Sequence, residues 1–252
     1  MPGSGGSWGV AGDHLESAVP TQTTSRDAPP ARGGGFPERR RARVEGPPAE
    51  TDRRFVIGIS GASGADYSCR VVEQLLIAGH EVHLVVSEYG QRLLFDERGV
   101  RRVSLAELLP RLSESPWGEV FERRLVVHPN KNVGAVIASG SFLHHGMAVI
   151  PCSSTSLGAM ATGAGSNLLT RAAMVTLKER RPLIVCHRET PLSLIDIENM
   201  RQLTLAGAVI CPTNPGLYLL PRSVDDIIDF VAGKVLDLLG VEHGLDTRWD
   251  GA

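Results

Sequence analysis

Aromatic side chains are scarce, since phenylalanine, tryptophan and tyrosine together make up 5% of the 252 residues. Proteins that bind single-stranded nucleic acid use aromatic side chains as stacking surfaces, so this class of function is disfavoured. An excess of positive charge is missing too, because 26 basic residues face 28 acidic ones. This balance argues against a general nucleic-acid surface but leaves room for a local anion pocket.

Cysteine is also rare, and no two cysteines form a Cys-x-x-Cys pair; the four are Cys69, Cys152, Cys186 and Cys211. We therefore expect free thiols in a reducing compartment. The adjacent His144 and His145 have no carboxylate or cysteine at a familiar ligand spacing, so we expect no metal site. No apolar run approaches the ~20 residues of a membrane span, and the N-terminus lacks a signal-peptide hydrophobic region. A cytoplasmic protein without a membrane partner is the expectation.

Periodic apolar residues are almost absent from residues 1–52, which are rich in Gly, Pro, Ser, Thr and Arg. Such a segment buries too little apolar surface to offset the entropy of ordering it. We expect a disordered N-terminal extension over 1–52 and one folded domain over 53–252.

From Arg53 onward, strand-like and helix-like patterns alternate. Strands are predicted at 55–60, 81–87, 120–128, 147–151, 182–186 and 208–211. Helices are predicted at 66–78, within 88–118 with 105–112 as the best candidate, between 152 and 180, from 191 to 206, and over 223–239. This alternation predicts the α/β class: a Rossmann-like (flavodoxin-like) doubly wound parallel sheet, covered by helices on both faces as a three-layer sandwich in a single domain.

Arg188 and Glu189 directly follow the apolar strand 182–186. Charges at the end of a buried strand are costly unless they are paired or used. Ligands of open α/β sheets bind outside the carboxyl ends of the strands, which is where this pair is expected. An ordinary ion pair or a helix start at Pro191 is the alternative.

The first strand leads into Ser60-Gly61-Ala62-Ser63-Gly64 before a predicted helix. Backbone N–H groups at such a turn bind anions, which favours a phosphate or flavin turn over a bare tight turn. The spacing matches neither the GxGxxG nor the Walker A pattern. The second strand ends in Ser87, next to Glu88, rather than in the acid that a ribose-binding site prefers.

Two runs of small polar residues follow later, at 138–142 and 151–156. Ser153, Ser154, Thr155 and Ser156 place four hydroxyls at a strand-to-helix junction, where they can bind a phosphate or a flavin edge. They can also cap the next helix, although one hydroxyl would suffice for that.

Four further residues carry ambiguous signals. Arg171 and Lys178 lie seven apart on one predicted helix and therefore share a face; taken alone, a solvated charged face is the simpler interpretation. Tyr218 follows a Pro-Gly turn, and Lys234 lies on the closing helix. The latter two could hold a phosphate or could both be surface groups.

Taken together, the motifs resemble the UbiX-type flavin prenyltransferases over about residues 54–250. The resemblance rests on the following segments: 61–64 (GASG), 138–141 (ASGS), 151–153 (PCS), 167–173 (NLLTRAA), 177–183 (LKERRPL), 188–191 (RETP) and 198–200 (ENM). It implies a homo-oligomer, usually a dodecamer, with active sites between subunits. Members of this family attach a dimethylallyl group to N5 and C6 of reduced FMN, and a UbiD-type decarboxylase uses the product.

The resemblance also implies roles for residues of this chain. FMN contacts are expected from Gly61, Ala62, Ser63, Ser87, Ser139, Ser153, Ser154, Thr155, Ser156 and Arg188. Dimethylallyl phosphate is expected to contact Tyr218, Lys234, Arg171 and Lys178, where the family often has Arg in place of Lys234. Catalytic roles fall to Ser63, Glu97, Lys178, Glu189 and Arg171, with Glu189 moving protons and no metal required. Trp249 is expected to close over the site.

Two alternatives differ in class. One is an FMN-dependent cysteine decarboxylase of the same fold, but the Pro-x-Met-Asn-x-x-Met-Trp segment typical of that group is replaced by Pro212-Thr213-Asn214-Pro215-Gly216-Leu217-Tyr218. The other is a non-catalytic flavin carrier or decarboxylase subunit, which would have no need of Glu189, Lys178 or Tyr218.

Overall fold

The fold is built on one six-stranded sheet with the strand order β3-β2-β1-β4-β5-β6. The structure is a computed structural model that describes residues 48, 51–245 and 247. Every strand pair is parallel. The strands are β1 (Arg54–Ile59), β2 (Glu81–Val86), β3 (Leu125–Pro129), β4 (Met147–Cys152), β5 (Leu183–His187) and β6 (Val209–Ile210). This is the doubly wound order of a Rossmann-like sheet, which confirms the predicted fold class.

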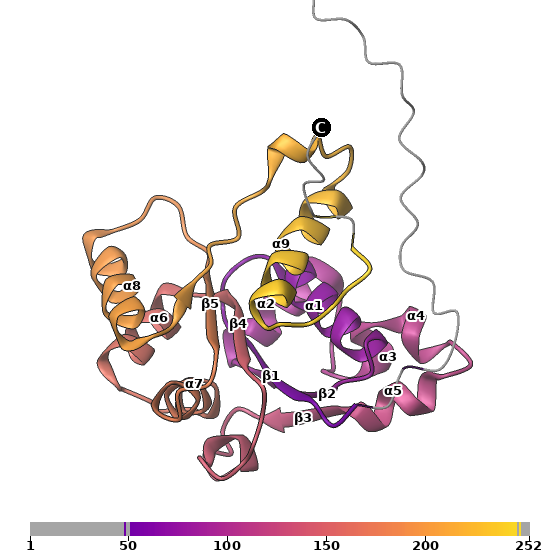
Figure 1. Cartoon of the computed structure of the whole chain (residues 1–252), viewed down its shortest axis with the longest axis horizontal. Helices are drawn as coiled ribbons and strands as arrows, with labels where there is room; N and C mark the ends of the chain where they lie inside the picture. The colour runs from indigo at the N-terminus through magenta and orange to yellow at the C-terminus, as the bar shows by residue number, and fades with distance from the viewer. Residues whose placement is uncertain (1–47, 49–50, 246, 248–252) are drawn as a thin grey trace, which may run out of the picture. The chain divides into compact units, whose positions relative to one another are not determined.

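Helices cover both faces of the sheet (Figure 1). On one side lie α1 (Ala65–Ile77), α2 (Glu88–Arg98), α3 (Leu105–Leu108), α4 (Pro110–Ser113), α5 (Gly118–Arg124) and α9 (Val224–Leu238). On the other side lie α6 (Ser154–Thr162), α7 (Leu168–Lys178), α8 (Leu194–Ala206) and the short 3₁₀ turn η1 (Val136–Ala138). A second 3₁₀ turn, η2 (Leu217–Leu219), precedes α9. Within the described residues, no helix has the length and apolar character needed to cross a membrane.

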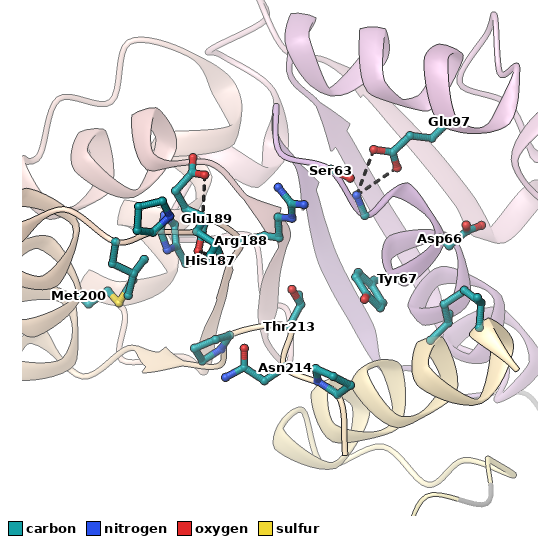
Figure 2. A pocket seen from close by; sticks show the side chains of 18 residues that line it. Ser63, Asp66, Tyr67, Glu97, His187, Arg188, Glu189, Met200, Thr213 and Asn214 are labelled. Carbon is teal, nitrogen blue, oxygen red and sulfur yellow. Dashed lines mark hydrogen bonds between the residues drawn. The ribbon is translucent and has the colours of Figure 1, made fainter. Parts of the chain in front are cut away.

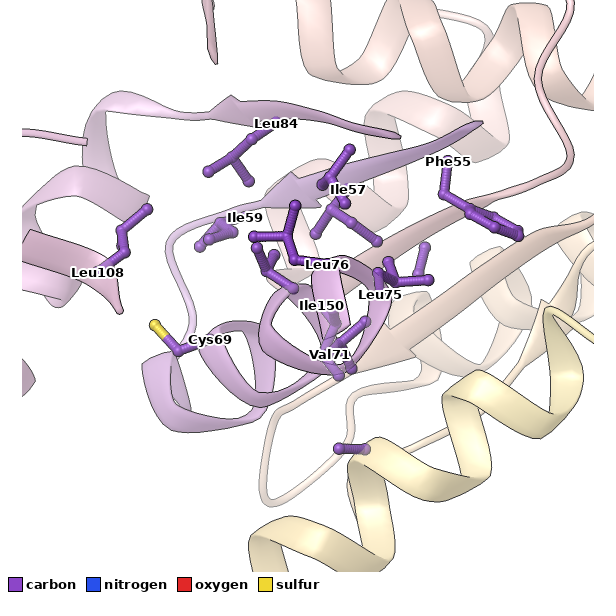
Figure 3. Packing of buried hydrophobic residues seen from close by; sticks show 14 of the residues in the cluster. Phe55, Ile57, Ile59, Cys69, Val71, Leu75, Leu76, Leu84, Leu108 and Ile150 are labelled. Carbon is purple, nitrogen blue, oxygen red and sulfur yellow. The ribbon is translucent and has the colours of Figure 1, made fainter. Parts of the chain in front are cut away.

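The two layers of core follow from the period-2 alternation of the strands. On β1, Phe55, Ile57 and Ile59 pack under α1 and α9 (Figure 3), whereas Val56 points into the core beneath α7. All four side chains are at most 2% exposed. A strand that is apolar on both faces can lie only in the middle of the sheet, and this is where β1 is found.

Two predicted elements between β2 and β4 are wrong in detail. The helix predicted over 105–112 is divided into α3 and α4 because Pro110 has no N–H to continue it. The strand predicted over 120–128 begins only at Leu125, because residues 118–124 form α5. Gly118 and Phe121, the buried residues of α5, are spaced i, i+3, a helical spacing that the apolar content of the segment concealed.

Helix capping was more readable from the sequence. Ser223, the first residue of the predicted closing helix, is the N-cap of α9, and its hydroxyl accepts a hydrogen bond from the N–H of Asp226 at 3.2 Å. The helix expected to open at Pro191 instead starts at Leu194, where Ser193 and Asp196 form a capping box. Residues 188–192 are thereby left as an exposed loop at the end of β5.

The extension predicted for residues 1–52 lies, apart from Pro48, Thr51 and Asp52, outside the described residues. The domain predicted from residue 53 onward contains the whole sheet. The chain leaves β1 toward β2 on one side and β4 lies on the other, which opens a crevice at the carboxyl ends of the strands.

Candidate active site at the carboxyl edge of the sheet

A pocket of about 650 Å³ opens where the segments after β1, β5 and β6 converge. We call it the main pocket (Figure 2). Its lining residues are Ser63, Gly64, Asp66, Tyr67, Glu97, His187, Arg188, Glu189, Thr190, Pro191, Leu192, Met200, Pro212, Thr213, Asn214, Pro215, Val224 and Ile228. The volume lies within the ~300–1,000 Å³ usual for small-molecule sites.

Arg188 and Glu189 enter this pocket from the end of β5. The N–H of Arg188 donates to the carbonyl of Cys152 at 3.0 Å, which extends the pairing of β5 with β4 by one residue. Both side chains are exposed, and neither forms an ion pair with any described residue. The predicted alternative of a structural ion pair therefore has no support within the described residues.

Tyr67 faces the same space from the first turn of α1. Burial raises the pKa of its hydroxyl, and the positive charge of Arg188 offsets part of that increase. Arg188 is thus close enough to act electrostatically across the pocket. An anion held there would meet a fixed cation in a partly desolvated environment.

The turn after β1 combines a required glycine with an occupied helix terminus. A Cβ on Gly61 would collide with Tyr89, and Gly64 has a positive φ of 124°. The N–H groups of Gly64 and Ala65 donate to Oε2 of Glu97 at 3.0 and 2.8 Å. The first N–H groups of α1, predicted to bind phosphate, are therefore bonded to a carboxylate of this chain.

A second cavity of about 510 Å³, which we call the side cavity, also lies at the carboxyl edge of the sheet. It is lined by Gly61, Ser87, Glu88, Tyr89, Asn130, Lys131, Ser153, Thr155, Ser156, Ser166 and Asn167. The lining residues come from the ends of β1, β2, β3 and β4 and from the loop before α7. Ala62, between the two cavities, is buried.

The four hydroxyls at the start of α6 have different environments. Ser153 is the N-cap and accepts from the N–H of Ser156 at 3.3 Å, while its own N–H donates to the hydroxyl of Ser60 at 2.7 Å. Ser154 turns toward His187, with 3.1 Å between Oγ and Nε2. Thr155 is exposed and lines the side cavity together with Ser156. The run therefore serves both capping and a cavity.

The predicted cations of α7 lie apart from these cavities. Arg171 and Lys178 are exposed and line neither the main pocket nor the side cavity. Lys178 pairs with Glu179, next to the turn that contains Ser139 and Gly140. The structure thus brings Lys178 close to Gly140, the residue after Ser139, but not to the main pocket that Glu189 lines.

Tyr218 and Lys234 also lie outside both cavities. Tyr218 is exposed on η2 and packs edge-on against Phe230, with ring centroids 5.9 Å apart. Lys234 is exposed on α9. Its charge contributes, after the stronger effect of a hydrogen bond with Cys186, to a pKa of about 7 for Cys211. Trp249 lies outside the described residues.

Several lining residues were not singled out from the sequence. Tyr67, Thr213 and Asn214 line the main pocket, and Asn130 and Lys131 line the side cavity. The rule that ligands collect at strand ends would have found Asn130 and Lys131, which directly follow β3. Tyr67 lies three residues after Gly64, within the helix turn that faces the same crevice.

Known proteins resemble this chain over the region that carries both cavities. The flavoprotein family matches residues 45–236. A flavin prenyltransferase UbiX of Halalkalibacterium halodurans is 44% identical over 195 residues, which span 77% of this chain and 92% of that protein. The crystal structure of AnUbiX (PadA1) with FMN and dimethylallyl pyrophosphate is 35% identical with a TM-score of 0.67, covering 79% of this chain and 98% of that one. A dodecameric FMN-dependent UbiX-like decarboxylase from Escherichia coli O157:H7 is 34% identical with a TM-score of 0.65, covering 79% and 100%.

Proposed function

The chain belongs to the UbiX flavin prenyltransferases of the flavoprotein family, and we propose that it transfers a dimethylallyl group to reduced FMN at the carboxyl edge of its sheet. The observation that carries this proposal is the position of Arg188 and Glu189. Both project, without an ion-pair partner among the described residues, into a pocket that adjoins a second, hydroxyl-lined cavity. A charged pair and a neighbouring polar cavity suit a reaction between two phosphate-bearing molecules.

The side cavity fits the phosphate end of FMN. Helix geometry leaves the N–H groups of Ser154 and Thr155 without intrahelical partners, and they lie at the positive end of the α6 dipole. Ser87, Thr155 and Ser156 add hydroxyls, and Lys131, which pairs with Glu88 at 3.0 Å, adds a cation. From here the ring system would extend past Gly61, Ala62 and Ser63 toward Arg188. We assign Ser139 a supporting position, because it lines neither cavity and precedes Gly140, which lies against Lys178.

The main pocket fits the dimethylallyl phosphate and the proton transfers. Reduced flavin supplies the nucleophilic N5 and C6 positions. Breaking an allylic C–O bond leaves a phosphate anion, which Arg188 would stabilise. Glu189 would take up the proton released at the ring and return it to the departing phosphate, with Ser63 across the pocket as a relay. Glu97 would hold the α1 turn in place beside them.

A second copy of the chain would complete the site. Arg171, Lys178, Tyr218 and Lys234 are exposed and lie outside both cavities, yet each is a group that a leaving phosphate needs. Helix α8 carries an apolar surface that water does not favour: Leu194, Ile195 and Leu205 are 72–74% exposed. An assembly of several copies, a dodecamer as in the Escherichia coli relative, would bury this surface and bring these four side chains to a neighbour's main pocket.

The product, prenylated FMN, would serve a UbiD-type decarboxylase. A cysteine decarboxylase is disfavoured, because residues 212–215 contribute Thr213, Asn214 and two prolines to the main pocket in place of that group's Met-Asn segment. A passive flavin carrier is disfavoured because it would not need a carboxylate at Glu189 that has no ion-pair partner among the described residues.

One experiment tests the proposal directly. Purified protein is mixed anaerobically with reduced FMN and either dimethylallyl monophosphate or diphosphate, and the released flavin is analysed by mass spectrometry. We expect flavin heavier by one prenyl unit with at least one of the two donors. Unmodified FMN with both donors would refute the assignment.

A further inference from the structure

A buried chain of polar side chains joins three elements at the wall of the main pocket, which His187 lines. His187, the last residue of β5, is 3% exposed, and Asp196, in the first turn of α8, is 6% exposed. Nε2 of His187 lies 3.1 Å from the hydroxyl of Ser154 on α6 and 3.8 Å from Oδ1 of Asp196. The chain therefore links the end of β5, the first turn of α6 and the first turn of α8.

The protonation states of Asp196 and His187 follow from their hydrogen-bond partners and their burial. Hydrogen bonds from the hydroxyls of Ser193 and Ser154 hold the pKa of Asp196 at about 2, so this carboxylate is ionised. Burial lowers the pKa of His187, so its imidazole is neutral near pH 7. Because Ser154 gives its proton to Asp196, its oxygen accepts from His187, which places the imidazole proton on Nε2.

The neighbours of Ser154 and His187 in the sequence connect these hydrogen bonds with the proposed reaction. Ser154 opens the helix whose first N–H groups are proposed to hold the FMN phosphate, and His187 directly precedes Arg188 and Glu189. Those two residues begin an exposed loop, in which the N–H of Arg188 is bonded to Cys152 and Glu189 accepts the N–H of Thr190 at 3.0 Å. Neither side chain has an ion-pair partner among the described residues. The His187 side chain thus connects the first turn of α6, which is proposed to bind the flavin, to the start of the loop that carries Arg188 and Glu189.

We propose that His187 is a positioning residue for prenyl transfer: through Ser154 and Asp196 it fixes the first turn of α6 relative to Arg188 and Glu189. This inference rests on the proposed function and assigns a role to a lining residue of the main pocket whose Nε2 faces Ser154 and Asp196. Small errors in the placement of reacting groups cost far more in turnover than in binding. Loss of the tie should therefore lower kcat and leave KM nearly unchanged.

The kinetic test compares His187→Leu, which removes the donor, with His187→Gln, whose side-chain amide can reach the same partner. For His187→Leu we expect kcat to fall about 10- to 100-fold, with KM for dimethylallyl phosphate within about threefold of the original protein. His187→Gln should stay within about threefold of the original kcat. The inference is overturned if His187→Leu turns over normally or if His187→Gln is equally impaired.

Two further variants separate positioning from folding. Ser154→Ala breaks the same chain while keeping the imidazole, so it should lower kcat as His187→Leu does, and the double variant should be no worse than either single one. His144→Leu removes another buried histidine, near the opposite end of the sheet, and should change stability without changing kcat. Additive losses in the double variant would contradict a shared chain.

Hydrogen–deuterium exchange gives a readout that does not depend on turnover. His187→Leu should speed exchange at residues 154–157 and 188–192, whereas His187→Gln and His144→Leu should not. If the original protein makes no prenylated flavin, the proposed function fails, and exchange still decides whether His187 ties the two segments. Unchanged exchange in His187→Leu would overturn the tie itself.

Discussion

Glu97 on α2 closes the N-terminus of α1 at Ala65: its Oε2 accepts the backbone N–H of Ala65 at 2.8 Å. The same oxygen accepts from Gly64 at 3.0 Å. An acidic group at this position satisfies two N–H groups that α1 cannot bond internally and lies at the positive end of the helix dipole. A carboxylate from another helix thus does what the N-cap residue, a glycine, has no side chain to do.

Removing that carboxylate should destabilise the protein. We expect Glu97→Ala to lower the free energy of unfolding by about 1 kcal/mol, the usual cost of losing a helix cap. The free energy of unfolding of Glu97→Gln should lie between those of the original protein and Glu97→Ala, because an amide oxygen accepts hydrogen bonds but carries no charge. Urea unfolding measures the difference. The matched control is Asp96→Ala, which removes only an exposed pair with Arg92 and should cost less than about 0.5 kcal/mol. Equal losses in the two alanine variants would contradict the cap.

Glu189→Gln should separate flavin binding from chemistry. The amide keeps the shape of the side chain but cannot take up a proton, so we expect prenylation to slow by about 10²- to 10⁴-fold while the Kd for FMN changes little. Single-turnover mass analysis and flavin fluorescence measure the two quantities. Glu122→Gln, exposed on α5 and away from both cavities, is the matched control. Normal turnover in Glu189→Gln would end the proton-transfer role.

Mixing two inactive variants should restore activity if sites form between copies. Lys178→Ala lacks the exposed cation of α7, and Glu189→Gln lacks the carboxylate of the main pocket. When the two are unfolded and refolded together in equal amounts, about a quarter of sites should contain both intact groups, and activity should recover to about that fraction. Arg123→Ala, an exposed cation on α5, should be active by itself. No recovery in the mixture would place Lys178 and Glu189 of one site in a single copy, and full activity of Lys178→Ala by itself would remove Lys178 from the reaction.

The buried His144 should make stability fall with acid. Burial, with Arg181 and His83 nearby, lowers its pKa from 6.5 to about 4. Between these values the unfolded chain binds more protons than the folded one, so the free energy of unfolding decreases as the pH falls from 6.5 to 4. The loss from this group amounts to at most about 3 kcal/mol.

His144→Phe should flatten that pH dependence while keeping the fold. The two hydrogen-bond partners of His144 keep other hydrogen bonds in this variant. The hydroxyl of Thr176 donates to Ala172 at 2.8 Å, and the carbonyl of Gly146 accepts from Val56 at 3.0 Å. Thermal unfolding at pH 4 to 7 measures the slope. The exposed His145→Asn should leave it unchanged. An identical slope in His144→Phe would show that other groups cause the acid sensitivity.

The sequence by itself determined the sheet and the edge at which the site lies. Strands such as β1 and β5 are apolar on both faces, and only a covered parallel sheet accommodates such strands. That pattern is local, so it can be read without knowing any contact. Arg188 and Glu189 directly follow the apolar residues of β5, so the sequence also placed them at the edge where ligands of such sheets bind. The family motifs supplied their roles as predictions.

Tertiary structure alone decided which partners each group has. Ser154 resembles its three hydroxyl neighbours in the sequence, but its hydroxyl forms hydrogen bonds with His187 and Asp196, which are distant in the sequence. Glu97 lies 32 residues from the N–H of Ala65 that it caps. Arg171 and Lys178 share a helix face in the sequence and in the structure, yet the sheet lies between that face and α1, away from the main pocket. Hydrogen bonds and charges act over a few ångströms in space, so only the folded chain assigns them.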